Sequence, residues 1–182
     1  MVLSRIVFNL IGLLLLAAFS LNLQASTPPL IKQVAIENNV PPDLFHAIIL
    51  AETQSRTQQG AKPWPWTINW KGKPYFFQTK HEAYQLAKSL TQKGITNFDI
   101  GIAQINWKWH SHRFPDLLSA FDPYWNLTAG AQHLREQYER PECNKWYIAA
   151  GCYHRPARGE KDIQIANKYR DRVLRIWEKL AF

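Results

Sequence analysis

The stretch PPDLFHAIILAET, residues 41–53, combines a helix-start signal with an apolar face. Proline is tolerated in the first turn of a helix, so we expect a helix from about Pro42 to about Thr53. Residues three, four and seven apart are neighbours on a helical surface. One face of this helix therefore carries three apolar residues and one acid, namely Phe45, Ile48, Ile49 and Glu52. A carboxylate stands where an apolar core residue is expected.

Glu52 is a candidate catalytic acid. Burying a charged carboxylate is costly unless the charge is paired or neutralised. Burial also raises the pKa of a carboxyl group, which suits a general acid that works near neutral pH. The alternative is that Glu52 lies near the end of the helix and its side chain reaches the solvent. Periodicity alone leaves both interpretations open.

The remaining sequence predicts a mainly helical chain. Apolar periodicity and helix-boundary residues indicate further helices, and residues 146–153 form another strongly apolar segment. The expected helices span about residues 30–37, 80–93, 102–109, 123–138 and 162–180. Residues 97–101 are expected to form a turn, and Thr79 with Glu82 forms a candidate capping box. The chain has 182 residues without internal repeats, enough for one domain with a sizeable core.

One segment breaks the helical pattern. Residues 67–77 read as a small β-hairpin around a turn at residues 71–73. Three tryptophans crowd this part of the sequence: Trp64, Trp66 and Trp70. They either fill local core or, where exposed, stack on sugar rings.

The N-terminus is typical of a secretory signal peptide. Arg5 precedes an apolar stretch at residues 6–23, and the small residues Ala25 and Ser26 follow. We expect cleavage after Ala25, so that residues 1–25 are removed and residues 26–182 form the mature domain. The alternative is an uncleaved membrane anchor, because the apolar stretch is borderline in length for a membrane span.

Export determines what the two cysteines are expected to do. Cys143 and Cys152 lie nine residues apart and would meet an oxidising compartment, so we predict a disulfide between them. Such a bond would stabilise the fold by about 2–3 kcal/mol. The alternative is two separate thiols, with Cys152 as a small core residue. Two cysteines without a CxxC spacing do not form a zinc site.

The formal net charge is +8, and it falls to +7 without residues 1–25, which contain Arg5 and no acid. A basic exported protein is suited to an anionic polymer such as a nucleic acid, an anionic lipid surface or a cell wall that carries carboxylates. The basic residues are scattered, and no nucleic-acid-binding motif occurs, so we expect no nucleic-acid partner.

Other polar residues are weaker candidates. Gln104 and Asn106 lie in an apolar segment, where buried amides must be hydrogen-bonded; they either bind a sugar or satisfy the core. His110 and His112 form an HxH pair, but no third ligand completes a metal site. The phenol of Tyr153 is placed to hydrogen-bond a catalytic carboxyl, or else it belongs to the core.

Three short segments together resemble a known family. They are AET at residues 51–53, GIAQIN at residues 101–106 and AGCYH at residues 150–154. In this order they resemble the motifs of the soluble lytic transglycosylase domain, a family with the lysozyme-like fold. Those motifs are a Glu-Ser pair that ends a helix, a Gly-Leu-Met-Gln-like motif and a Tyr-Asn motif. The resemblance covers about residues 30–180.

The resemblance implies a mainly α, lysozyme-like fold with a small β-hairpin insertion. It also implies a substrate, the glycan of peptidoglycan, cut between N-acetylmuramic acid and N-acetylglucosamine. Segments at residues 63–67 and 122–127 look like those of family members linked to conjugation, secretion or pilus machinery. By this resemblance the protein would act in the periplasm as a monomer, with components of an envelope-spanning apparatus as further partners.

A lytic transglycosylase needs one carboxylate. By resemblance, Glu52 would protonate the leaving oxygen and then take the proton of the muramic acid C6 hydroxyl, which closes a 1,6-anhydro ring without water. Thr53, Gln104, Asn106 and Tyr153 would orient the sugar or the acid. No metal or cofactor is needed.

Three residues depart from the family's pattern. Thr53 stands where Ser is usual, Ala103 where Met is usual, and His154 where Asn is usual. The shorter Ala103 is expected to open space beside the sugar site. His154 is the departure that matters most, because histidine titrates and asparagine does not.

Two other functions stay open. A hydrolytic lysozyme on the same fold would need a second carboxylate, as most glycosidases do. Asp99 is the nearest acid to a motif, but we expect it to cap the following helix. A non-catalytic module that binds glycan and recruits an assembly complex would have no need of an acid on an apolar stripe.

Overall fold

The computed structural model describes residues 27–57, 60–156 and 159–181. The predicted signal peptide, residues 1–25, lies outside these ranges. Within them, no helix combines the length and the apolar character that crossing a membrane requires.

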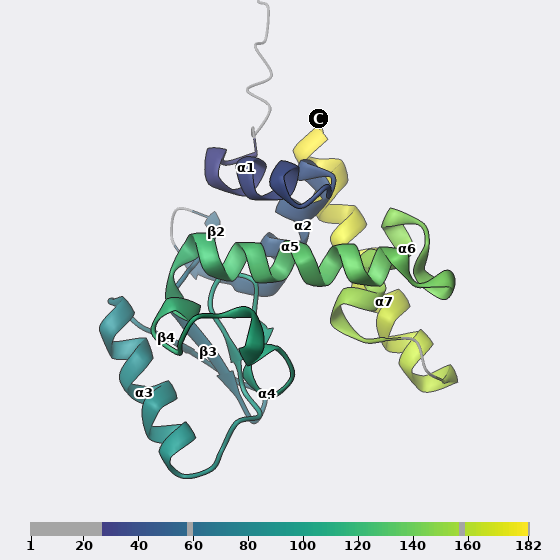
Figure 1. Cartoon of the computed structure of the whole chain (residues 1–182). Coiled ribbons are helices and arrows are strands. Elements are labelled where there is room, and N and C mark those ends of the chain that lie inside the picture. Colours follow the sequence, from purple (N-terminus) through teal and green to yellow (C-terminus); the bar gives the residue numbers. More distant parts are fainter. Residues whose placement is uncertain (1–26, 58–59, 157–158, 182) are drawn as a thin grey trace, which may run out of the picture.

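Helices make up most of the described chain (Figure 1). The described ranges contain seven α-helices: α1 (Pro29–Glu37), α2 (Pro42–Thr53), α3 (Lys80–Gln92), α4 (Trp107–His110), α5 (Pro123–Glu139), α6 (Trp146–His154) and α7 (Glu160–Ala181). Short 3-10 helices occur at Ser111–Arg113, Ser119–Phe121 and Pro141–Cys143. The mainly helical class predicted from the sequence is confirmed.

Local sequence signals account for several helix starts. Thr79 Oγ1 accepts a hydrogen bond from the Glu82 amide at 3.2 Å, and the Glu82 carboxylate accepts one from the Thr79 amide at 3.0 Å. This reciprocal capping box opens α3 as predicted. The Asp122 carboxylate caps α5 by accepting a hydrogen bond from the Tyr124 amide at 3.0 Å. Each contact satisfies an amide that the helix itself leaves unpaired.

A four-stranded antiparallel sheet holds the predicted hairpin. Its order is β4 (Lys73–Phe76), β3 (Thr67–Trp70), β5 (Asp99–Ile100) and β6 (Ile105–Asn106). The hairpin of β3 and β4 is confirmed, and β5 and β6 extend it. A separate two-stranded pair follows α2, formed by β1 (Gln54–Thr57) and β2 (Gly60–Pro63).

The segment after α3 differs from the prediction. The expected turn at residues 97–101 contains β5, and the expected helix at residues 102–109 is instead a turn, β6 and the four-residue α4. Gly101 and Gln104 have φ angles of 74° and 48°, a left-handed backbone that a right-handed helix cannot contain. The prediction was wrong because apolar periodicity in so short a run does not separate strand from helix.

Asn126 fixes this turn against α5. Its Oδ1 accepts a hydrogen bond from the Ala103 amide at 2.7 Å, and its Nδ2 donates to the carbonyl oxygens of Ile100 and Ala120 at 3.1 and 2.9 Å. The side chain is buried, so these three bonds satisfy backbone groups that have no water to replace them. A Cβ on Gly101 would lie 2.3 Å from Asn126 Nδ2, which explains the glycine at that position.

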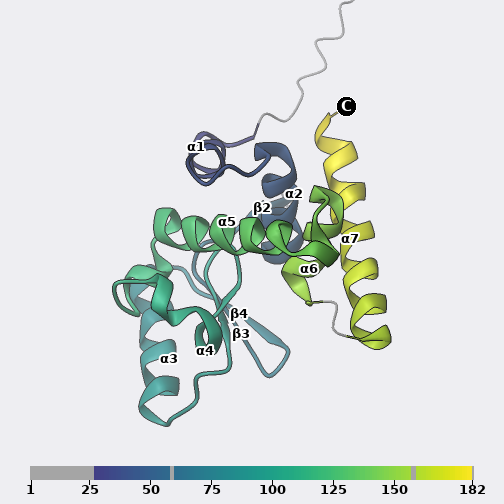
Figure 2. The ribbon, with the colours of Figure 1, turned by 45° about the vertical axis from the view of Figure 1, so that its right-hand side comes forward.

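The core lies where the helices meet. In Figures 1 and 2, α5 crosses the middle of the molecule, with α1 and most of α2 on one side of it and the sheet with α3 on the other. α2 packs against α1 and α7, and α6 packs against α5 and α7. Fully buried side chains at these contacts include Phe45, Ile48, Ile49, Leu134 and Val173. The apolar face predicted for residues 42–53 is thus part of the core.

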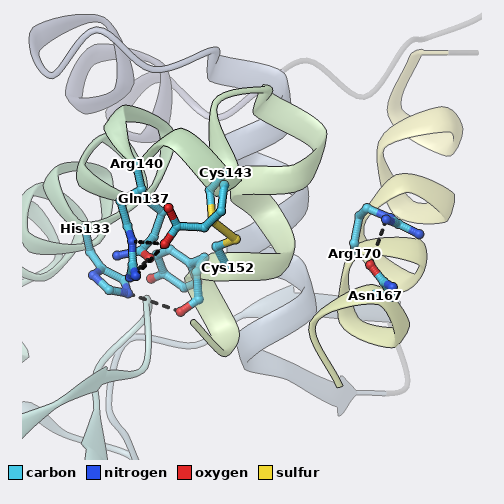
Figure 3. Close-up of a disulfide and its surroundings, with 9 residues drawn as sticks. His133, Gln137, Arg140, Cys143, Cys152, Asn167 and Arg170 are labelled. Atoms are coloured by element: carbon cyan, nitrogen blue, oxygen red, sulfur yellow. Dashed lines mark hydrogen bonds and ion pairs between the residues drawn. A yellow bond between two sulfur atoms is a disulfide. The ribbon is translucent and has the colours of Figure 1, made fainter. Parts of the chain in front are cut away.

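The predicted disulfide is confirmed. Cys143 and Cys152 are bonded and both are buried, with their Cα atoms 6.5 Å apart. The bond joins the 3-10 helix after α5 to α6, and Figure 3 shows it beside the α5 residues His133 and Gln137. It therefore holds α6, which carries Tyr153, next to α5.

The tryptophans of the hairpin region fill local core. Trp66 and Trp70 are partly buried and pack against the hydrophobic core. Trp64 Nε1 donates a hydrogen bond to the Phe77 carbonyl oxygen at 2.8 Å, and its ring meets Trp66 edge-on. These contacts favour the core interpretation over a sugar platform.

Candidate active site

A cleft of about 1280 Å³ opens at the C-terminal end of α2. Its lining comes from α2, from strands β3, β5 and β6, and from the helices α4 to α7. Four of the predicted site residues line it: Glu52, Gln104, Asn106 and Tyr153. The side chain of Thr53, the fifth, lies outside the part of the chain that the structure describes.

Glu52 is nearly enclosed at this cleft. Its side chain is 14 % exposed, so it does not reach freely into the solvent. Burial raises the pKa of its carboxyl group to about 7, and the nearby negative charge of Asp99 raises it as well. A hydrogen bond from Tyr169 and the positive charge of Arg172 act in the opposite direction. A large fraction of the Glu52 carboxyl groups therefore carries a proton at neutral pH.

Tyr169 and His154 both lie beside the same oxygen of the Glu52 carboxyl group. The Tyr169 hydroxyl donates a hydrogen bond to Glu52 Oε1 at 2.6 Å, and His154 Nδ1 lies 3.9 Å from that oxygen. The two rings stack almost parallel, with centroids 4.5 Å apart. Burial lowers the pKa of His154, as do the charges of Arg155 and Arg172. The histidine beside the acid is therefore mainly neutral at neutral pH.

Tyr153 does not make the hydrogen bond that the sequence suggested for it. Its hydroxyl donates to the Ala103 carbonyl oxygen at 2.7 Å in a buried position, and the phenol on Glu52 is Tyr169 instead. Tyr153 therefore ties α6 to the turn before β6. Tyr169 belongs to an apolar stripe of α7, three residues after Ala166 and four before Val173, and nothing in that spacing indicates the polar contact of its hydroxyl.

Ala103 does not open space in the cleft. Its side chain is fully buried and is not part of the cleft lining. A Cβ on Gly130 would lie 2.7 Å from the Ala103 Cβ and 3.2 Å from the Tyr153 hydroxyl. The small Ala103 side chain therefore lets the turn pack closely against Gly130 of α5, and it does not widen the sugar site.

Gln104 and Asn106 belong to a polar wall on the sheet side of the cleft. Gln104 Nε2 donates hydrogen bonds to Thr67 Oγ1 at 2.7 Å and to the Gly101 carbonyl oxygen at 3.0 Å. Asn106 Nδ2 donates to Asp99 Oδ1 at 2.8 Å and to Asn97 Oδ1 at 3.0 Å. Both amides are thus fixed in orientation by the protein. The Asn106 oxygen is buried and has no hydrogen-bond partner among the described residues, whereas Gln104 is only partly buried and lines the cleft.

Asp99 is a second carboxylate in the cleft. It lies in β5 and accepts a hydrogen bond from Asn106, so the expectation that it caps a following helix was wrong. Burial raises the pKa of its carboxyl group, and the hydrogen bond from Asn106 lowers it. The short strand β5 was predicted as a turn, and the position of Asp99 was missed with it.

The histidine pair shows no metal site. Within the described residues, no group of three His, Cys, Asp or Glu side chains is arranged to hold a metal ion. His110 Nδ1 accepts a hydrogen bond from Arg113 Nε at 3.3 Å, and its ring lies 4.6 Å from that of His133. Burial, together with the charges of His133 and Arg113, lowers the pKa of His110 to about 4.

An exposed aromatic side chain completes the cleft. Trp109 lines it and is 64 % exposed, while the neighbouring Lys108 ammonium lies 4.8 Å from the centre of its ring. An exposed indole face is a surface on which a sugar ring can stack. The sequence drew attention to other tryptophans, because their crowding was visible and the exposure of Trp109 was not.

Comparisons with known proteins found no relative of this chain. No family model matches the chain, and neither a curated protein nor a solved structure matches it.

Proposed function

We propose that this chain is a peptidoglycan lytic transglycosylase with a lysozyme-like fold. The observation that carries the proposal is the Glu52 carboxyl group, which is enclosed at a large cleft and has a pKa of about 7. A general acid is most useful when its pKa lies near the working pH. The order of the three sequence motifs around Glu52, Gln104 and Tyr153 supports the same assignment.

The cleft suits an extended glycan. Its volume of about 1280 Å³ exceeds the range of about 300–1,000 Å³ that is usual for small-molecule sites. Gln104 offers a fixed amide to the hydroxyl and N-acetyl groups of sugars, and Trp109 offers a stacking surface. These groups suit the hydroxyl-rich sugars of a glycan.

The reaction needs one residue in two roles. Protonated Glu52 donates its proton to the oxygen that leaves C1 of N-acetylmuramic acid, and the C1–O bond breaks. The carbonyl oxygen of the substrate's own N-acetyl group stabilises the positive charge at C1. Glu52, now ionised, takes the proton of the C6 hydroxyl as that oxygen bonds to C1. The anhydro ring closes, and Glu52 is protonated again.

Tyr169 and His154 support both roles. The Tyr169 hydroxyl keeps Glu52 Oε1 in place at 2.6 Å and stabilises the carboxylate after it has lost its proton. Neutral His154, 3.9 Å away, adds no positive charge that would ionise Glu52 before the reaction. The histidine that replaces the usual asparagine is therefore compatible with an acid that starts protonated.

A hydrolytic lysozyme is the second candidate, and Asp99 is the observation that favours it. Asp99 lines the same cleft and is close enough for its charge to raise the pKa of Glu52. An inverting glycosidase uses a second carboxylate to activate water. The two reactions differ in their products, since hydrolysis leaves a reducing end and transglycosylation leaves an anhydro end.

The cellular setting is part of the proposal. The apolar N-terminal segment and the buried disulfide support export to the periplasm, where peptidoglycan lies. There the enzyme would open the wall locally as a monomer during assembly of a conjugation, secretion or pilus apparatus.

Release of soluble muropeptides from purified cell walls tests the enzymatic proposal. We expect wild-type protein and a Glu139→Gln control to release muropeptides at equal rates, because Glu139 is exposed and lies outside the cleft. Glu52→Gln should reduce the rate at least about a hundredfold, the lower range for loss of an acid–base group. Undiminished release by Glu52→Gln would refute Glu52 as the acid, and binding without release by wild type would favour a glycan-binding module.

A further inference from the structure

Two cations on α7 face the cleft without an acidic partner. Lys168 and Arg172 both line the cleft, and residues four apart on a helix lie on the same face. Among the residues that the structure describes, neither side chain forms an ion pair. Arg170, which lies between them, donates a hydrogen bond to Asn167 at 2.8 Å (Figure 3) and another to Asp171 at 2.9 Å.

The acids around the cleft are already engaged. Arg113 binds Glu136 at 2.6 Å, and Arg155 lies 3.7 Å from Asp162. Asp99 accepts the amide of Asn106 on the sheet side. No described acid of the cleft forms an ion pair with Lys168 or Arg172, so both remain available to a ligand.

These cations lie beside the reacting group. Arg172 is close enough to Glu52 to affect its pKa, and Tyr169, three residues before Arg172 on α7, bonds the same carboxyl. Figures 1 and 2 show the sheet and the N-terminal half of α7 on different sides of the molecule below α5. The lining thus has an amide-rich side from the sheet and a cationic side from α7.

A neutral sugar gives such cations nothing to bind, but muramic acid carries a lactyl group. Its carboxyl is either free, in glycan without peptides, or linked to a peptide that bears carboxylates of its own. We propose that Lys168 and Arg172 form an anion subsite that binds a carboxylate carried by the muramic acid unit next to the cleaved bond. This inference rests on the proposed glycan substrate and adds the group by which one sugar is distinguished from the other.

Binding of soluble glycan strands tests the subsite without depending on catalysis. All variants carry Glu52→Gln, so that the strands stay intact, and dissociation constants are measured by calorimetry. The test variant is Lys168→Gln/Arg172→Gln. The control is Arg175→Gln/Lys179→Gln, which removes the same charge from the same helix at exposed positions outside the cleft.

Three probes separate the sources of the carboxylate. They are strands with their peptides, strands stripped of peptides so that the lactyl carboxylate is free, and stripped strands whose carboxyls have been converted to neutral amides. We expect the test variant to bind at least one of the first two about tenfold more weakly than the control does, and the amidated strands equally well. A loss confined to peptide-bearing strands assigns the subsite to peptide carboxylates, and a loss on stripped strands assigns it to the lactyl carboxylate.

Equal binding by the test and control variants on all three probes would overturn the subsite. So would an equal loss on amidated strands, because it would show a role that does not involve the carboxylate. The proposed function fails separately: if the chain with Glu52 intact releases no anhydro product, a selective loss of binding in the test variant still supports the subsite.

Discussion

Ionisation of Glu52 should destabilise the folded protein, and Glu52→Gln should remove that effect. The pKa of Glu52 is about 7 in the folded protein, against 4.5 for an ordinary glutamate. The folded chain therefore binds this proton more tightly than the unfolded chain does. Each unit of pKa difference corresponds to about 1.4 kcal/mol, so the whole difference amounts to about 3 kcal/mol.

The direction of the pH dependence follows from proton binding. Between pH 4.5 and about 7 the folded chain keeps a proton that the unfolded chain has lost, so the free energy of unfolding falls as the pH rises. In Glu52→Gln this contribution is absent, while the amide oxygen can still accept the hydrogen bond of Tyr169. Relative to wild type, the variant should gain up to about 3 kcal/mol on going from about pH 5 to about pH 8.

Urea unfolding followed by tryptophan fluorescence measures this difference. Wild type, Glu52→Gln and the exposed control Glu139→Gln are unfolded at both pH values, and the control corrects for the loss of one surface acid. An identical pH dependence in wild type and Glu52→Gln would contradict this prediction, because it would mean that the Glu52 carboxyl has an ordinary pKa in the folded state.

Three further predictions concern the groups that position the acid and the fold around it. Tyr169→Phe removes the donor to Glu52 and should move the falling limb of the pH profile of muropeptide release to higher pH by about one unit; a limb that stays in place or moves to lower pH would contradict this. Asn126→Ala leaves three buried backbone groups unpaired and should lower the free energy of unfolding by at least about 3 kcal/mol in urea titrations, whereas a loss below about 1 kcal/mol would show that the three bonds do not hold the turn. Replacing Cys143 and Cys152 by serine should lower the free energy of unfolding by about 2–3 kcal/mol, and reduction of the wild type should reproduce that loss; no loss by either route would contradict it.

The helices could be predicted because their signals are local. Residues 42–53 contain a helix-start signal and an apolar face. The capping box of α3, Thr79 with Glu82, can also be recognised in the sequence. The segment from β5 to α4 could not be predicted in this way. Its path depends on the left-handed backbone of Gly101 and Gln104 and on the side chain of Asn126, which lies 23 residues beyond Ala103. Contacts at such a separation leave no periodic pattern.

The residues of the candidate site also differ in whether a local sequence signal reveals them. Glu52 was visible because a carboxylate interrupts an apolar stripe, and the order of the three motifs led to Gln104 and Tyr153. Tyr169 was hidden, since its ring fits the apolar stripe of α7 and its hydroxyl finds a partner 117 residues away. Asp99 was hidden because its strand has only two residues and lacks any alternation.

Digestion of purified peptidoglycan in water enriched in heavy oxygen distinguishes attack by the C6 hydroxyl from attack by water. If Glu52 acts first as acid and then as base on the C6 hydroxyl, mass spectrometry should find anhydro-muramic ends without the heavy isotope. Glu52→Gln should yield none of these ends. New reducing ends in place of anhydro ends would contradict this mechanism, because they would show that water, and not the C6 hydroxyl, attacks C1.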